Sequence, residues 1–218
     1  MKRSILMICA VFLMISGTVL GGWSVTTISD PTSLAGDGVL HKASNFGYGA
    51  AAQTIGGISY DIDYSNITNA SAVSDSWADK FYSGTDAAIN NLMNTGGNVS
   101  EWGPTMMTLN LSGLTVGNDY RFQLITGPAW TGAGANLYAN GGADYQYVYF
   151  ADASVNLATY TWTADSTSLV VDTTAGSGEG SYYNLGYAVH DVTSVPEPAT
   201  LLLLGAGAAA GLRRRRSR

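Results

Sequence analysis

The chain has 218 residues, of which 46% are hydrophobic and only 12% are charged, and it contains a single cysteine. Between Gly22 and Val195 there are fifteen acidic residues and three basic ones, so this part carries about twelve negative charges while the whole chain carries six. An acidic surface of this kind repels nucleic acid and anionic lipid headgroups, which argues against binding to either. The length is enough for one domain with a substantial core.

The N-terminus has the pattern of a secretory signal peptide. Lys2 and Arg3 form a positive start, an unbroken apolar run covers residues 5–15, and Gly21 and Gly22 offer small residues for cleavage. We therefore predict a signal peptide helix over residues 1–22, with the Sec export machinery and signal peptidase as partners. Cys9 lies inside this run, so the exported part has no disulfide and no thiolate metal ligand.

Residues 23–194 are rich in Gly, Ala, Ser, Thr, Asn, Asp and Tyr and poor in Lys and Glu, a composition that favours short strands joined by polar turns. Alternating patterns predict strands at 23–28, 54–63, 105–111, 119–125, 145–150, 158–163, 169–172 and 183–189. The runs 105–111 and 119–125 are expected to pair through the glycine-containing link 112–118. In the second of them Tyr120, Phe122 and Leu124 face one side, and Arg121 and Gln123 face the other.

One segment departs from this pattern. Ile89, Leu92 and Met93 stand at helical spacing in 86–93, with Thr85 as a possible N-cap and glycines following. The fold class is therefore all-β, a jelly-roll-like β-sandwich with one short helix, flanked by the signal peptide helix and a C-terminal apolar helix.

Two aspartates in the predicted strand 54–63 suggest a cation site. Asp61 and Asp63 are two residues apart, so their carboxylates share one face of a strand, and Ca²⁺ prefers such oxygen ligands. The alternative is two solvated aspartates on a polar face opposite Ile62. No other cofactor is expected.

A catalytic set is not evident in the predicted domain. His41 and His190 are its only histidines, and Glu101 and Glu179 its only glutamates. A serine nucleophile needs a histidine beside it, and glycoside hydrolysis needs a positioned pair of carboxylates; no motif or spacing singles out either. His190, at the end of a predicted strand, is expected to be a surface or packed histidine. We predict that the chain is not an enzyme.

Two tryptophans are candidates for stacking on a sugar ring. Trp130 lies in the glycine-rich stretch 127–142, which is expected to be a long loop at one end of the sandwich, and Trp102 precedes Gly103-Pro104. Asn136, Asn140 or Asp144 would supply hydrogen bonds to the same ligand. The alternative is that both indoles and the tyrosine run 145–149 only pack the sandwich.

The C-terminus combines a short motif, an apolar run and a basic end. Val195, Pro196, Glu197 and Pro198 form an extended stretch, because two prolines fix φ and remove two donors. Residues 199–212 follow, apolar except for Thr200; as a helix they would span about 21 Å, against about 30 Å for the hydrocarbon core of a bilayer. The arginine cluster at the end (Arg213, Arg214, Arg215, Arg216) would stay on the cytoplasmic side.

These three parts, in this order at the end of the chain, resemble the PEP-CTERM sorting signal of Gram-negative bacteria. The resemblance implies that a membrane-embedded exosortase recognises Pro196-Glu197-Pro198 and removes the tail, and that the protein is exported, often in company with exopolysaccharide production. The predicted domains are then residues 1–22, the signal peptide; 23–194, the β-sandwich; and 195–218, the sorting signal.

A second resemblance concerns the sandwich itself. The segments Gly84–Met93, Met107–Leu124 and Tyr160–Leu169 are similar to β-sandwich domains of the galactose-binding-like kind. The leading interpretation is an exported, non-enzymatic protein of the cell envelope or extracellular matrix, with a transient or retained C-terminal membrane anchor. The alternative is a carbohydrate-binding module that recognises an exopolysaccharide or another glycan.

Overall fold

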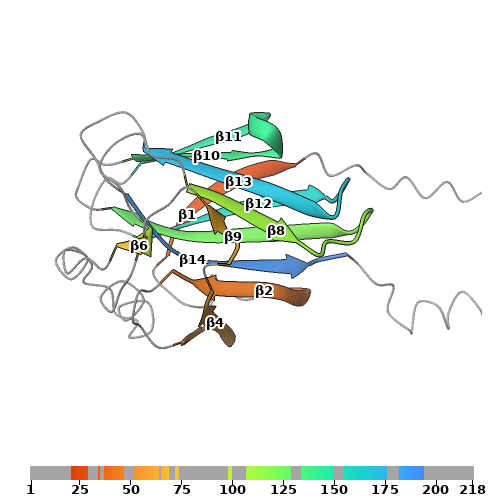
Figure 1. Ribbon diagram of the computed structural model, residues 1–218, viewed down its shortest axis with the longest axis horizontal. Coiled ribbons are helices and arrows are strands. Elements are labelled where there is room, and N and C mark those ends of the chain that lie inside the picture. Colours follow the sequence, from red (N-terminus) through yellow and green to blue (C-terminus); the bar gives the residue numbers. More distant parts are fainter. Residues whose placement is uncertain are drawn as a thin grey trace, which may run out of the picture.

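The computed structural model describes residues 21–28, 34, 37–46, 52–63, 65–68, 72–73, 98–99, 107–128, 134–149, 155–175 and 182–193. Their strands form two sheets, as the sequence predicted (Figure 1). In the first sheet the order is β1 (Gly22–Thr27), β12 (Asn156–Thr163), β9 (Asp119–Pro128), β14 (Tyr182–Asp191), β2 (Val39–Asn45), β4 (Ile58–Ile62) and β3 (Gln53–Ile55), with β6 (Ala72–Val73) and β7 (Asn98–Val99) attached beside β14. In the second sheet it is β11 (Asp144–Tyr149), β10 (Gly134–Ala139), β13 (Ser168–Ala175), β8 (Met107–Ser112) and β5 (Ile67–Thr68).

The main core fills the space between the two sheets. Alternate residues of each strand point into it, among them Tyr120, Phe122 and Leu124 of β9, and from β8 Met107, Leu109 and Leu111. Full burial of one such side chain contributes roughly 1.5–3 kcal/mol. The predicted alternation in β9 is therefore confirmed, and the fold class is an all-β sandwich.

The first sheet is buried on its other face as well. A second apolar cluster there joins Ile125 and Leu185 to Ile28, Leu34, Ile55, Ile58, Tyr60, Val155, Leu157 and Ala188. Because this face is covered, Gln123 and His190 are buried polar residues rather than parts of a solvated surface. His190 is thus a packed histidine, one of the two roles expected for it.

Several element boundaries differ from the prediction. The strand expected over 54–63 is a hairpin, β3–β4, because Gly56 and Gly57 adopt φ values of 58° and 82° and form its two-residue turn. The loop expected over 127–142 is interrupted by β10, which follows the end of β9 at Pro128 and leads into a short 3₁₀ turn at Asn140–Gly142. The predicted helix 86–93, residues 1–20 of the signal peptide predicted over 1–22, and the tail lie outside the described residues.

The strands β8 and β9 were predicted to pair, and this is wrong. β8 pairs with β13 in the second sheet, whereas β9 lies between β12 and β14 in the first. The link between them therefore crosses the sandwich, and the β12–β13 link does the same. No helix in the described part of the chain is long and apolar enough to cross a membrane.

Candidate functional site

The outer face of the second sheet carries a cluster of tyrosines. In β11, Tyr145, Tyr147 and Tyr149 point away from the core, while Val148 between them is buried in it. Tyr138 of β10 stands opposite Tyr145 in the register. Tyr145 and Tyr149 are 53% and 58% exposed, so their rings are open to solvent. We refer to Tyr138, Tyr145, Tyr147, Tyr149 and the adjoining Asn136 as the tyrosine face.

Neighbouring residues hold these rings in place. The Tyr145 hydroxyl donates to Asn136 Oδ1 at 2.9 Å, and Asn136 Nδ2 donates to Thr174 Oγ1 of β13 at 3.3 Å. The Tyr138 and Tyr145 rings pack with centroids 5.3 Å apart. Tyr147 leans over Gly134, where an added Cβ would collide with its hydroxyl oxygen. The absence of a side chain at Gly134 is therefore what lets Tyr147 lie along the sheet.

Polar groups extend the tyrosine face across the rest of the sheet. On β13 and β8, Asp172 accepts a hydrogen bond from Thr108 Oγ1 at 2.7 Å. Asn110 Nδ2 and Thr68 Oγ1 lie 3.5 Å apart further along, and Val170 is 40% exposed beside them. Among the described residues of this face, Asp172 is the only acidic or basic one. The surface is thus aromatic at one side, hydrogen-bonding at the other, and nearly uncharged.

The sequence alone did not determine which way the tyrosine run 145–149 faces. Its alternation predicted a strand but fitted two orientations, since either the tyrosines or Gln146 and Val148 could face inward. The alternative in which the tyrosines pack the sandwich is wrong for Tyr145 and Tyr149, which lie on the outer surface. The inward position of Val148 follows from the pairing with β10, where Ala135 is its buried partner.

The predicted sugar-binding residues are distributed over different places. Trp130 and Trp102 lie outside the described residues, and Asn136 belongs to the tyrosine face. Asp144 does not, because its carboxylate accepts the Tyr160 hydroxyl at 2.5 Å on the inner side of the sheet. Burial, together with this hydrogen bond and the carboxylate charge, raises the pKa of Tyr160. Asn140 lies in the 3₁₀ turn with φ 52°.

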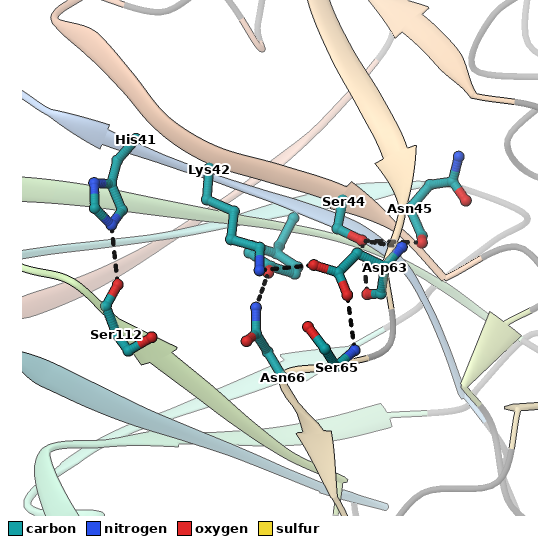
Figure 2. A network of polar contacts seen from close by, with 9 residues as sticks. His41, Lys42, Ser44, Asn45, Asp63, Ser65, Asn66 and Ser112 are labelled. Atoms are coloured by element: carbon teal, nitrogen blue, oxygen red, sulfur yellow. Dashed lines mark hydrogen bonds and ion pairs between the residues drawn. The ribbon is translucent and has the colours of Figure 1, made fainter.

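Asp61 and Asp63, the proposed calcium ligands, have different surroundings (Figure 2). Asp63 Oδ2 forms an ion pair with Lys42 Nζ at 2.8 Å, and its Oδ1 accepts the backbone N–H of Ser65 at 2.8 Å. The Lys42 hydrogen bond, followed by those from Ser65, lowers the pKa of Asp63 to about 2. Asp61 is exposed on β4 and accepts a bond from Ser59 Oγ at 3.2 Å. Within the described residues no group of three or more His, Cys, Asp or Glu side chains is placed to hold a metal ion.

The Lys42–Asp63 pair belongs to a polar network that joins the two sheets along one side of the sandwich. Ser44 Oγ lies 2.9 Å from the Asp63 carbonyl oxygen, and Asn66 Nδ2 donates to the Tyr187 hydroxyl at 3.0 Å. The Asn66 carbonyl in turn accepts the N–H of Asn110 on β8. These groups satisfy one another's hydrogen-bonding capacity, so the network connects β2, β4 and β8 and has a structural role.

Neither histidine is hydrogen-bonded to a side-chain nucleophile among the described residues. His41 Nε2 donates to the Ser112 carbonyl oxygen at 3.1 Å, since a carbonyl can only accept. Burial, with a smaller contribution from Arg121, lowers the pKa of His190, so this buried imidazole is neutral at pH 7.

Comparison with known proteins identifies the tail. Residues 194–216 match the PEP-CTERM protein-sorting motif, which confirms the predicted sorting signal. A search among curated proteins gave no match.

Solved structures that resemble the chain include carbohydrate-binding modules. CBM35 from Cellvibrio japonicus Abf62 is 13% identical with a TM-score of 0.37, and the match covers 68% of this chain and 92% of that one. The CBM22-1 xylan-binding domain from Paenibacillus barcinonensis Xyn10C is 12% identical with a TM-score of 0.40, over 74% and 99% of the two chains. A family two carbohydrate esterase from Cellvibrio japonicus is 9% identical with a TM-score of 0.36; the match covers 82% of this chain but only 36% of the esterase.

Proposed function

We propose that this is an exported, non-enzymatic protein of the cell envelope or extracellular matrix of a Gram-negative bacterium, sorted through its C-terminal tail and processed there by an exosortase. The match of residues 194–216 to the PEP-CTERM motif carries the proposal. The apolar run of the tail is short for a permanent span, and the arginines behind it favour the cytoplasmic side. Both properties suit a tail that is inserted for recognition and then removed.

The positions of the domain ends support this topology. Gly22, the first residue of β1, pairs with Thr161 of β12. Thr161 pairs with Arg121 of β9, and Arg121 pairs with His190 near the end of β14. The chain therefore enters and leaves the domain at the same end of the first sheet. A domain with a signal peptide before it and a sorting tail behind it can keep both segments at one membrane surface.

Mass spectrometry of the protein purified from the culture medium tests the proposal. We expect a chain that begins near Gly22 or Trp23 and lacks the arginine cluster. Replacement of Pro196, Glu197 and Pro198 by alanine should leave the tail in place and hold the protein in the membrane fraction, whereas Ser217→Ala, outside the matched residues, should be processed normally. An intact C-terminus on the extracellular wild-type protein would overturn the sorting proposal.

Glycan binding is a second candidate, and the exposure of Tyr145 and Tyr149 favours it. Aromatic rings that are open to solvent on a sheet face contribute no core packing, so they are available to a ligand. This candidate function would operate in the matrix to which the tail directs the protein.

A further inference from the structure

We propose that the tyrosine face binds an uncharged polysaccharide chain, with Tyr145 and Tyr149 as its stacking platforms. The inference rests on the proposed export to a matrix and assigns to the sandwich the surface with which it would hold that matrix. It depends on the residues of β10, β11 and β13 alone and not on the two predicted tryptophans.

The first argument is the chemistry of the exposed groups. A pyranose ring has an apolar C–H face and a rim of hydroxyls, so its partner must offer flat apolar area beside hydrogen-bonding groups. The Tyr145 and Tyr149 rings supply the area; Asn136 lies on the neighbouring strand β10, and Thr174 and Asp172 lie on β13 beyond it. Aromatic side chains with a polar tip are the usual means of recognition where one side of a contact is apolar and the other wet.

The second argument is the reach of the platform. Tyr145 and Tyr149 are four residues apart on one strand, so their Cα atoms are separated by about 14 Å at roughly 3.4 Å per residue. This distance exceeds the width of a single sugar ring. The face is therefore suited to successive units of a chain rather than to a monosaccharide.

The third argument is charge. The domain between Gly22 and Val195 carries about twelve negative charges, and the described strands of the second sheet contain no lysine, arginine or histidine. An anionic polymer would be repelled by the domain. A cationic one would find on this face only the Asp172 carboxylate, which already accepts a bond from Thr108, so an uncharged polymer fits best. The same net charge opposes association with a second copy of the chain, because two domains that each carry about twelve negative charges repel each other.

The fourth argument is preorganisation. The chain of hydrogen bonds from Tyr145 to Asn136 and on to Thr174 holds the Tyr145 platform before any ligand arrives, and Tyr147, between the two platforms, is fixed over Gly134. A platform that is already ordered loses less side-chain entropy on binding. The bonds also orient Asn136 with its amide at the border between the aromatic and the polar part of the surface.

Gel retardation of the exported protein tests the inference, with hydroxyethylcellulose, xylan, galactan and dextran as neutral probes and alginate as the anionic one. We expect at least one neutral polymer to retard the wild-type protein and alginate not to. The double variant Tyr145→Ala/Tyr149→Ala should bind the retarding polymer about tenfold more weakly or worse, as is usual when the central aromatic groups of an interface are truncated.

Two control variants separate ring stacking from general effects. Val116→Ala removes a side chain that is 57% exposed in the β8–β9 link, away from the tyrosine face, and should bind like the wild type. Tyr145→Phe keeps the ring, loses only the bond to Asn136, and should retain most of the binding. Urea unfolding of each variant shows whether it is folded; Tyr149→Ala alone serves if the double variant is not.

The following outcomes overturn the inference. One is no retardation by any of the four neutral polymers; another is equal retardation of the wild type and the double variant. A third is sedimentation that shows a wild-type dimer and a monomeric double variant, because the tyrosine face would then be a contact between copies. None of these results would contradict the sorting proposal, which is tested separately by the C-terminus that mass spectrometry finds.

Discussion

At the scale of single residues, the ion pair between Lys42 and Asp63 makes a defined contribution to stability. The two side chains are 31% and 35% exposed, so water screens the pair and its contribution is about 1 kcal/mol or less. The pKa of Asp63 is about 2 in the folded protein against an ordinary 3.8. A carboxyl whose pKa is depressed by folding stabilises the protein above the unfolded value, and this stabilisation is lost as the pH falls from about 3.8 through about 2.

We therefore expect Lys42→Met to lower the free energy of unfolding by about 1 kcal/mol or less at pH 7 and to raise the pKa of Asp63 toward its ordinary value. Urea unfolding at several pH values and an NMR titration of the carboxyl measure the two effects. The difference between variant and wild type should vanish below pH 2, where Asp63 is protonated in both. Asp61→Asn, on the exposed face of β4, is the control and should change little; an unchanged titration of Asp63 in Lys42→Met would contradict the argument.

At the scale of elements, the two links that cross the sandwich are bonded to each other. Gly117 N–H donates to the Ala164 carbonyl at 2.8 Å, Ala164 N–H donates to the Asn118 carbonyl at 2.9 Å, and Leu114 N–H donates to the Thr167 carbonyl at 3.1 Å. Beneath them the Tyr120 and Trp162 rings stack at 5.4 Å, and the Tyr120 hydroxyl accepts the N–H of Thr115 at 2.9 Å. A tyrosine of the core thus holds one link in place.

Tyr120→Phe should lower the free energy of unfolding by about 0.5–1.5 kcal/mol, because it removes the acceptor of the Thr115 N–H and leaves the stacked ring intact. Tyr145→Phe removes a hydroxyl of the same kind from an exposed ring and should change stability by less than about 0.5 kcal/mol. Urea unfolding of both variants at the same pH makes the comparison. Equal effects would show that the Thr115 bond does not hold the link.

The sequence predicted the features that depend on a strand's own residues and not those that depend on contacts between strands. Local alternation was enough to find β9, β11, β12 and β14, since a half-buried strand leaves a period of two in its own residues. Alternation could not predict which strands pair with each other, because a link such as 113–118 has the same glycine and polar residues whether it turns within one sheet or crosses to the other sheet. The tyrosine face was missed for a similar reason: its orientation depends on the pairing of Val148 with Ala135, which is a contact between two strands.

At the scale of the whole molecule, the excess of acidic residues sets the response to ions. About twelve uncompensated negative charges repel one another in the compact state, so added salt should stabilise the domain by screening. A cation bound at Asp61 and Asp63 would stabilise the domain further, in addition to this general effect of salt screening. Such a site would have to compete with Lys42 and Ser65, which already occupy the two oxygens of the Asp63 carboxylate.

Calcium binding at Asp61 and Asp63 stays a prediction of the sequence, and matched ionic strength separates it from screening. From the occupied carboxylate of Asp63, we expect CaCl₂ to raise the melting temperature no more than NaCl does at equal ionic strength. Addition of a chelator in constant salt should then leave the melting temperature unchanged. A rise specific to calcium that disappears in Asp61→Asn and persists in Asp172→Asn, an aspartate of the opposite sheet, would contradict this expectation. It would show that calcium displaces Lys42 from Asp63, in which case the Lys42→Met variant should bind the ion more tightly than the wild type.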